Sequence, residues 1–109
     1  MICVLVIRLL GDETNEKFVS IVSVWEVAIK LSKDNFHLEG GLKEFLLMIR
    51  SNDVPLLPIK EEYLYYIPDM PKLHKDPFDR LLIATAKAEN MILVTADENI
   101  HKYDVSWFW

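Results

Sequence analysis

The chain has 109 residues, a formal net charge of −5 and one cysteine, and 51 % of its residues are hydrophobic. This length and composition predict one folded domain and exclude a disordered segment. No apolar run approaches the ~20 residues needed to cross a bilayer. A single cysteine excludes an internal disulfide, so we expect a cytoplasmic protein without membrane contact. The negative charge excludes nucleic-acid binding by broad phosphate neutralisation, but not an acidic site that works through metal ions.

The first half of the chain predicts two strands and two helices. Phe18–Ser23 is a short β-branched strand, and the helical stretch VWEVAIKL follows it directly. Gly40 and Gly41 break the chain before a second amphipathic helix over Leu42–Arg50. Val54–Ile59 carries two prolines, which favour an edge position for this strand.

The second half of the chain predicts helices that alternate with strands. Pro77–Asn90 has the clearest helical pattern, and a buried strand follows it over Met91–Thr95. We expect a shorter helix at Glu61–Ile67, a turn or helix at Asp97–Tyr103, and a last strand at Val105–Trp109. Strands alternating with helices predict an α/β fold with a mainly parallel sheet and helices on both faces.

Two helix starts carry acids that can act either as caps or as ligands. Ser23 and Glu26 have the spacing of a capping box. Asp76 and Asp79 repeat this spacing, with Pro77 at the first helical position. Taken singly, each of these acids is more often a residue that helps a helix to begin.

The positions of these acids in the predicted sheet support the alternative interpretation, that they are metal ligands. In an open parallel sheet, ligands bind beyond the carboxyl ends of the strands, and both Glu26 and Asp97 follow such an end. Asp79 joins them if the loop before its helix rises over the same edge, although Asp97 taken alone is more often a turn residue. Three converging carboxylates would need a cation between them. An all-oxygen site suits Mg²⁺ or Mn²⁺, which can activate water against a phosphodiester.

Three ordered blocks of sequence, VSIVSVWEVAIKL, HKDPFDRLLIATA and LVTADENI, resemble the PIN domains of the VapC toxin family over about Lys17 to Trp109. The resemblance implies one PIN-like domain over residues 1–109, in three layers. It also implies a hydrolase: a metal-dependent ribonuclease from a toxin–antitoxin pair, with RNA as substrate and Mg²⁺ or Mn²⁺ as cofactor. Its protein partner would be an antitoxin that occupies the active-site groove.

The resemblance also assigns roles to single residues. Those matching the family's metal-site and catalytic acids are Glu26, Asp79 and Asp97. Asp76 matches an acid that borders the site, and we interpret it chiefly as the helix cap. Arg80 could bind a substrate phosphate or pair with a nearby acid, and Thr95 could bond a metal-bound water or simply favour a strand. Lys30, one turn after Glu26, is expected to form an ion pair with it.

The N-terminal segment, residues 1–17, departs from the family pattern of a strand ending in an aspartate and then a helix. Met1–Leu10 has no acid and no basic start, so we expect neither the family's first aspartate nor a signal peptide. Asp12 stands in the wrong context to replace that aspartate. The connection Gly11–Lys17 is too short for a parallel crossover, which takes about a dozen residues.

Two interpretations of Met1–Leu10 follow: it fills the place of the helix before strand 18–23, which we favour, or it forms a strand paired in a nonstandard way. Under the first, the domain is N-terminally truncated and its ribonuclease activity is weakened by the loss of one acid. The strand edges left open would then favour a homodimer.

Two further functions are weighed against an active toxin. One is a catalytically inactive PIN-like domain that binds an antitoxin or its own dimer partner. The other is a phosphoacceptor receiver domain, which needs an acid after its first strand and a buried lysine late in the chain. Neither feature is evident in the sequence, so the receiver domain ranks far below the others.

Overall fold

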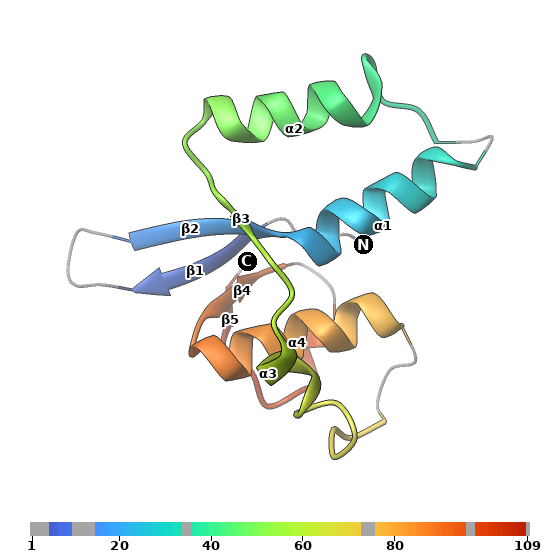
Figure 1. The fold of residues 1–109 in the computed structure, drawn as a ribbon. Helices are drawn as coiled ribbons and strands as arrows, with labels where there is room; N and C mark the ends of the chain where they lie inside the picture. Colours follow the sequence, from blue (N-terminus) through green and yellow to red (C-terminus); the bar gives the residue numbers. More distant parts are fainter. Residues whose placement is uncertain (1–4, 10–14, 34–35, 73–75, 96–97, 109) are drawn as a thin grey trace.

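Five strands form a mixed sheet in the order β3-β2-β1-β4-β5 in the computed structural model, which describes residues 5–9, 15–33, 36–72, 76–95 and 98–108 (Figure 1). The strands are β1 (Leu5–Leu9), β2 (Asn15–Ser20), β3 (Leu56–Leu57), β4 (Ile92–Val94) and β5 (Trp107–Phe108). β1 is antiparallel to both of its neighbours, whereas β2 pairs with β3 and β4 pairs with β5 in parallel. Four of the described strands therefore run in one direction, and the predicted α/β class is confirmed.

The central strand of the sheet is β1, and this corrects our preference for a helix position at Met1–Leu10. Val6 pairs with Phe18 of β2 and with Leu93 of β4, and its side chain is 1 % exposed. Because β1 runs against β2, a short connection joins them and no crossover is needed. With β1 in the centre, the open strand edges from which we expected dimerisation are filled.

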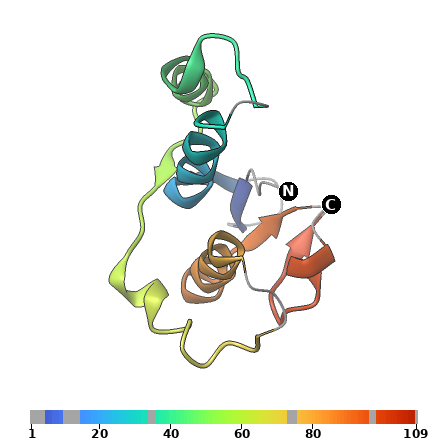
Figure 2. The ribbon, with the colours of Figure 1, turned by 90° about the vertical axis from the view of Figure 1, so that its right-hand side faces the viewer.

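The helices are α1 (Ile21–Leu31), α2 (Gly41–Ser51), α3 (Glu61–Leu64), α4 (Pro77–Glu89) and α5 (Glu98–His101). Figure 2 shows α2 farthest from the strands β4 and β5, with α1 between α2 and α4. None of the helices in the described part of the chain is long and apolar enough to cross a membrane.

The start of α1 lies three residues before the predicted one. Ser20, not Ser23, is the N-cap, and its Oγ accepts a hydrogen bond from the Val22 N–H at 3.0 Å. Ser23 is instead a buried residue of the first turn. The β-branched start of the helix favours a strand locally, but Val22 is 0 % exposed, so burial in the core overrides this propensity. Glu26 therefore lies in the second turn and closes no capping box.

α4 forms as its local sequence predicts. The Asp76 carboxylate accepts hydrogen bonds from the backbone N–H groups of Phe78 and Asp79, at 2.9 and 3.3 Å, and Pro77 occupies the first turn. The helix ends at Asn90, which adopts the left-handed conformation at φ 55°. Since β4 follows almost immediately and runs back, α4 begins at the edge of the sheet where β4 ends.

The remaining predictions hold in outline, with one shortened helix. α2 and β4 form where expected, and β3 lies at the edge of the sheet, as its flanking prolines indicated. α3 ends at Leu64 and does not reach Ile67, because turn hydrogen bonds from Tyr66 N–H to the Tyr63 carbonyl and from Ile67 N–H to the Leu64 carbonyl follow it. Tyr63 is 1 % exposed and Tyr66 is 44 % exposed, so the two tyrosines do not share a buried face.

The main hydrophobic core surrounds α4, whose Leu82, Ile83 and Ala84 are fully buried. A smaller core joins β2, α1 and α2 through Val19, Val24 and Ile49. The two cores fix α1 and α4, the helices that carry the acids of interest.

A partly exposed ionic network centred on Glu89 fastens β1 to the end of α4. Glu89 accepts hydrogen bonds from Arg8 Nη2 at 3.1 Å, from Lys60 Nζ at 3.1 Å and from the Tyr63 hydroxyl at 2.6 Å. The hydrogen bond from Tyr63, with the charges of Lys60 and Arg8, holds the pKa of Glu89 below its usual range, although burial acts in the opposite direction. Arg8 also pairs with Glu16 on the neighbouring strand at 3.4 Å.

Glu89→Gln should lower the free energy of unfolding at neutral pH by about 1.5–3 kcal/mol, the typical effect of hydrogen bonds to a charged group. The lowered pKa means that Glu89 stabilises the fold fully above its unfolded-state pKa of ~4.3, and that this contribution is lost as the pH falls through its folded pKa. The difference in the free energy of unfolding between wild type and Glu89→Gln should therefore become smaller below about pH 4. Urea unfolding across this range measures it.

Glu16→Gln is the matched control, because it removes another acid bound to the same arginine at a more exposed position. Its expected effect is below ~1 kcal/mol. Equal losses of unfolding free energy in Glu16→Gln and Glu89→Gln would contradict a central role for Glu89.

Candidate functional site

Topology brings the starts of α1 and α4 to the same edge of the sheet. β2 and β4 both run against β1, so their carboxyl ends lie at one edge. α1 begins directly after β2, and α4 begins at the edge where β4 ends. This is the edge at which the sequence predicted a ligand site.

Buried polar side chains concentrate at this edge. Within the described residues the buried polar side chains are Ser20, Ser23, Glu26, Asp79, Thr85 and Thr95. Ser20 caps α1, and the Thr85 hydroxyl donates to the Leu81 carbonyl at 2.8 Å, so these two serve local backbone contacts. The other four belong to the first half of α1, the first turn of α4 and the position after β4. Such a concentration is typical of a functional site.

Two of the predicted acids, Glu26 and Asp79, are deeply buried on helices that contact each other. Glu26 is 5 % exposed and Asp79 is 1 % exposed. Their neighbours Trp25 and Phe78 meet edge to face, with ring centroids 4.8 Å apart and an interplanar angle of 75°. This aromatic contact holds the starts of α1 and α4 together. Lys30 Nζ lies 3.9 Å from Glu26 Oε2, so the expected ion pair is confirmed.

The remaining predicted acids are Asp97 and Asp76. Asp97 lies outside the described part of the chain. Asp76 is engaged by the N–H groups of Phe78 and Asp79, which confirms its interpretation as the cap. Among the residues with described positions, no group of three or more His, Cys, Asp or Glu side chains is placed to hold a metal ion.

The two other predicted site residues, Arg80 and Thr95, form hydrogen bonds with backbone or side-chain groups near this edge. Arg80 follows Asp79 directly, and its Nη2 donates to the Ile67 carbonyl at 3.1 Å, so it anchors the loop before α4 and does not pair with an acid through this bond. Thr95 is 1 % exposed at the end of β4, and its carbonyl lies 2.8 Å from His101 Nε2.

Sequence reasoning missed Ser23 as a member of this site. We interpreted it as a cap, whereas it is 4 % exposed inside α1. Its place one turn before Glu26, at i,i+3 spacing, puts both side chains on the same helix face and is the signal that could have identified it.

The donor set suits a hard divalent cation. Glu26 and Asp79 are both buried at this edge, where a bound cation would offset the cost of burying their charge. Carboxylate and hydroxyl oxygens are ligands that Mg²⁺ and Mn²⁺ prefer. Glu26 and Asp79 thus fit a metal-dependent reaction.

A model of the PIN domain family matches residues 5–106. The match covers nearly the whole chain, including the atypical β1, and the chain therefore belongs to the PIN domain family. Proteins of this family are generally metal-dependent nucleases that use divalent ions and bind RNA. Comparisons with curated proteins and with solved structures give no match.

Proposed function

We propose that this chain is a metal-dependent endoribonuclease of the VapC type, the toxin of a toxin–antitoxin pair acting in the cytoplasm. The observation that supports it best is the pair of buried carboxylates, Glu26 and Asp79, at the contact of α1 and α4. Both belong to the sequence blocks that resemble the VapC family, VWEVAIKL and DPFDRLL. The chain has a net charge of −5, so it would bind RNA at a site where bound metal ions offset the local negative charge.

Glu26, Asp79 and Asp97 would hold Mg²⁺ or Mn²⁺ in this proposal. When bound, the ion would lower the pKa of a water molecule and offset the charge that builds on the phosphodiester. Lys30 orients Glu26 through its ion pair, and the contact between Trp25 and Phe78 holds the starts of α1 and α4 together. Asp76 sets the start of α4 and so the position of Asp79.

The activity is proposed to be weaker than that of family members with an additional acid. The residues of β1, LVIRL, include no carboxylate. Moreover, β1 runs against β2 and β4, so its carboxyl end lies at the opposite edge of the sheet from the candidate site.

The second candidate is an inactive PIN-like domain that binds an antitoxin or a second copy of itself. It is favoured by large apolar side chains exposed on α1 and α2: Trp25, Ile29, Leu47 and Met48, which are 36–55 % exposed. Exposed apolar patches of this kind mark protein contacts.

Incubation of purified chain with a structured and an unstructured RNA, with Mn²⁺ or with EDTA, separates the two functions. An active toxin should cut the RNA at defined internal positions with Mn²⁺ and leave it intact with EDTA. RNA that stays intact with Mn²⁺ at an equimolar amount of protein would favour the inactive binding domain.

A further inference from the structure

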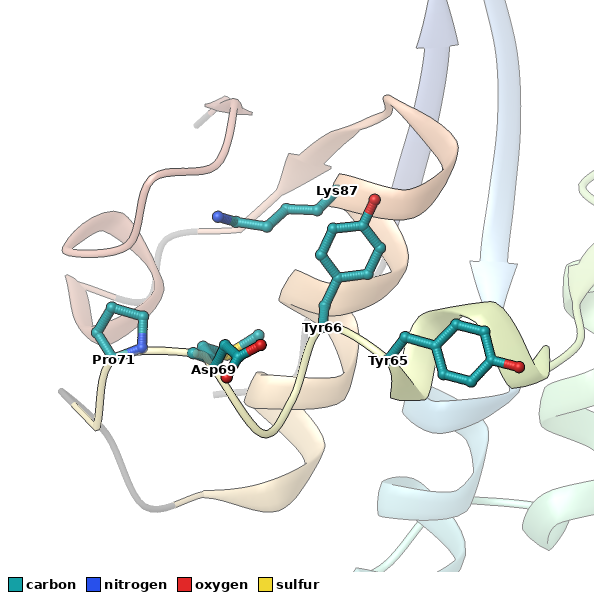
Figure 3. Close-up of a pocket in the computed structure, with 6 residues that line it drawn as sticks. Tyr65, Tyr66, Asp69, Pro71 and Lys87 are labelled. Carbon is teal, nitrogen blue, oxygen red and sulfur yellow. The ribbon is translucent and has the colours of Figure 1, made fainter.

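A hollow of about 390 Å³ opens beside the second half of α4, away from the candidate metal site. Its walls are Tyr65, Tyr66, Asp69, Met70, Pro71 and Lys87. Figure 3 shows the Tyr66 ring and the Lys87 side chain extending to the same side of the connection between α3 and α4. The volume lies within the range of small-ligand pockets, ~300–1,000 Å³.

Tyr66 and Lys87 also border a second hollow of about 410 Å³. Asn90, Asp104 and Ser106 give this one a polar rim. The tyrosine and the lysine therefore stand between two adjoining hollows and line both of them.

Neither side chain belongs to the buried core of the described residues. Tyr66 is 44 % exposed, and Tyr63 takes the buried place beside Glu89. Within the described part of the chain, the Tyr66 hydroxyl and the Lys87 ammonium form no hydrogen bond or ion pair. An aromatic face and a cation thus stay available side by side.

Arg80 lies on α4 between the candidate metal site and Lys87. A third hollow of about 400 Å³ is lined by Ile67, Pro68, Lys72, Pro77 and Arg80. Arg80 directly follows Asp79 and lies seven residues before Lys87, so the two cations share one face of α4 about 10 Å apart.

We propose that Tyr66 and Lys87 bind a nucleotide of single-stranded RNA that extends from the metal site along α4, past Arg80. This rests on the proposed function for the choice of RNA. The Tyr66 ring stacks on a base, and Lys87 meets a phosphate. The mixed polar and aromatic lining suits a nucleotide better than an apolar protein segment. Three cations, Lys72, Arg80 and Lys87, line these hollows and are available to phosphates, beside two acids, Asp69 and Asp104.

The test is the binding of a fluorescently labelled single-stranded uridine oligonucleotide in EDTA, followed by anisotropy. Tyr66→Ala should weaken binding by about 5- to 100-fold, the usual loss for one base stacked on an aromatic ring. Lys87→Gln should make the dependence of log K on log salt shallower by about 0.7, the value for one phosphate contact on a single strand.

Tyr65→Ala and Lys43→Gln are the matched controls. Tyr65 is 64 % exposed and borders the hollow, but its ring is directed away from Lys87 (Figure 3), and its hydroxyl bonds to Glu61. Lys43 is an exposed lysine on α2. Both variants should bind RNA within about twofold of wild type, whereas a single stacked base alone changes affinity by more.

Binding that is indifferent to Tyr66, or that falls equally in Tyr65→Ala, would overturn the inference, as would a wild type that does not bind the oligonucleotide. A different result would refute the proposed function alone. A chain that binds RNA through Tyr66 but never cuts it with Mn²⁺ would refute the nuclease and leave this inference standing.

Discussion

Asp79→Asn should abolish most of the Mn²⁺-dependent RNA cleavage while the protein stays folded. Asp79 is 1 % exposed in the first turn of α4, at the edge where β2 and β4 end. An amide of the same shape keeps the packing but withdraws the charge that a divalent ion needs. A displacement of the reacting groups by about 1 Å already costs ~100-fold, so kcat/KM should fall by at least that factor. Glu26→Gln should act in the same direction.

Asp53→Asn controls for the loss of one negative charge. Asp53 is exposed and adopts a left-handed conformation that asparagine also tolerates, so its cleavage rate should match wild type. Cleavage that persists in Asp79→Asn at the wild-type rate would show that the buried acids are not the catalytic ones.

Ile7→Pro should leave the chain unfolded in the absence of denaturant. Ile7 lies in the centre of β1 and pairs with Lys17 of β2 and Ile92 of β4. Proline donates no backbone hydrogen bond and is found essentially only on edge strands. A small domain has a total stability near ~5 kcal/mol, so a broken central strand removes most of it. Far-UV circular dichroism and urea titration measure the effect.

Ile7→Ala isolates the backbone contribution, because it removes side-chain contacts but keeps the N–H group. Ile7 is partly buried, and we expect this variant to fold with a loss of about 1–2 kcal/mol. If proline were tolerated as well as alanine, residues 5–9 would not form a central strand.

Local chemistry explains why α4 could be predicted almost to the residue. Asp76, Pro77 and Asn90 are each suited to one position at a helix end, and no other residue nearby competes for it. The sequence predicted a start of α1 at Ser23, whereas Ser20 caps the helix, and both serines are able to cap. Which serine caps the helix depends on which side chains reach the core, and the isolated sequence does not contain that information.

Strand direction was predictable only in part. The seven residues Gly11–Lys17 excluded a parallel crossover, but whether Met1–Leu10 then pairs as a strand depends on contacts with the distant β4. Glu26 could be placed at one edge because it follows a predicted strand closely, whereas the place of Asp79 depended on the path of the loop before its helix. The hollow at Tyr66 and Lys87 could not be foreseen, since it depends on the path of the loop between α3 and α4.

Calorimetric titration with Mn²⁺ tests most directly whether Glu26 and Asp79 form a metal site. Wild type should bind Mn²⁺ with an affinity in the millimolar range or somewhat tighter, as for ions held by few carboxylates. Asp79→Asn and Glu26→Gln should each weaken binding by at least tenfold, whereas Asp53→Asn should bind as wild type does. Equal Mn²⁺ affinity in wild type and Asp79→Asn would contradict the account.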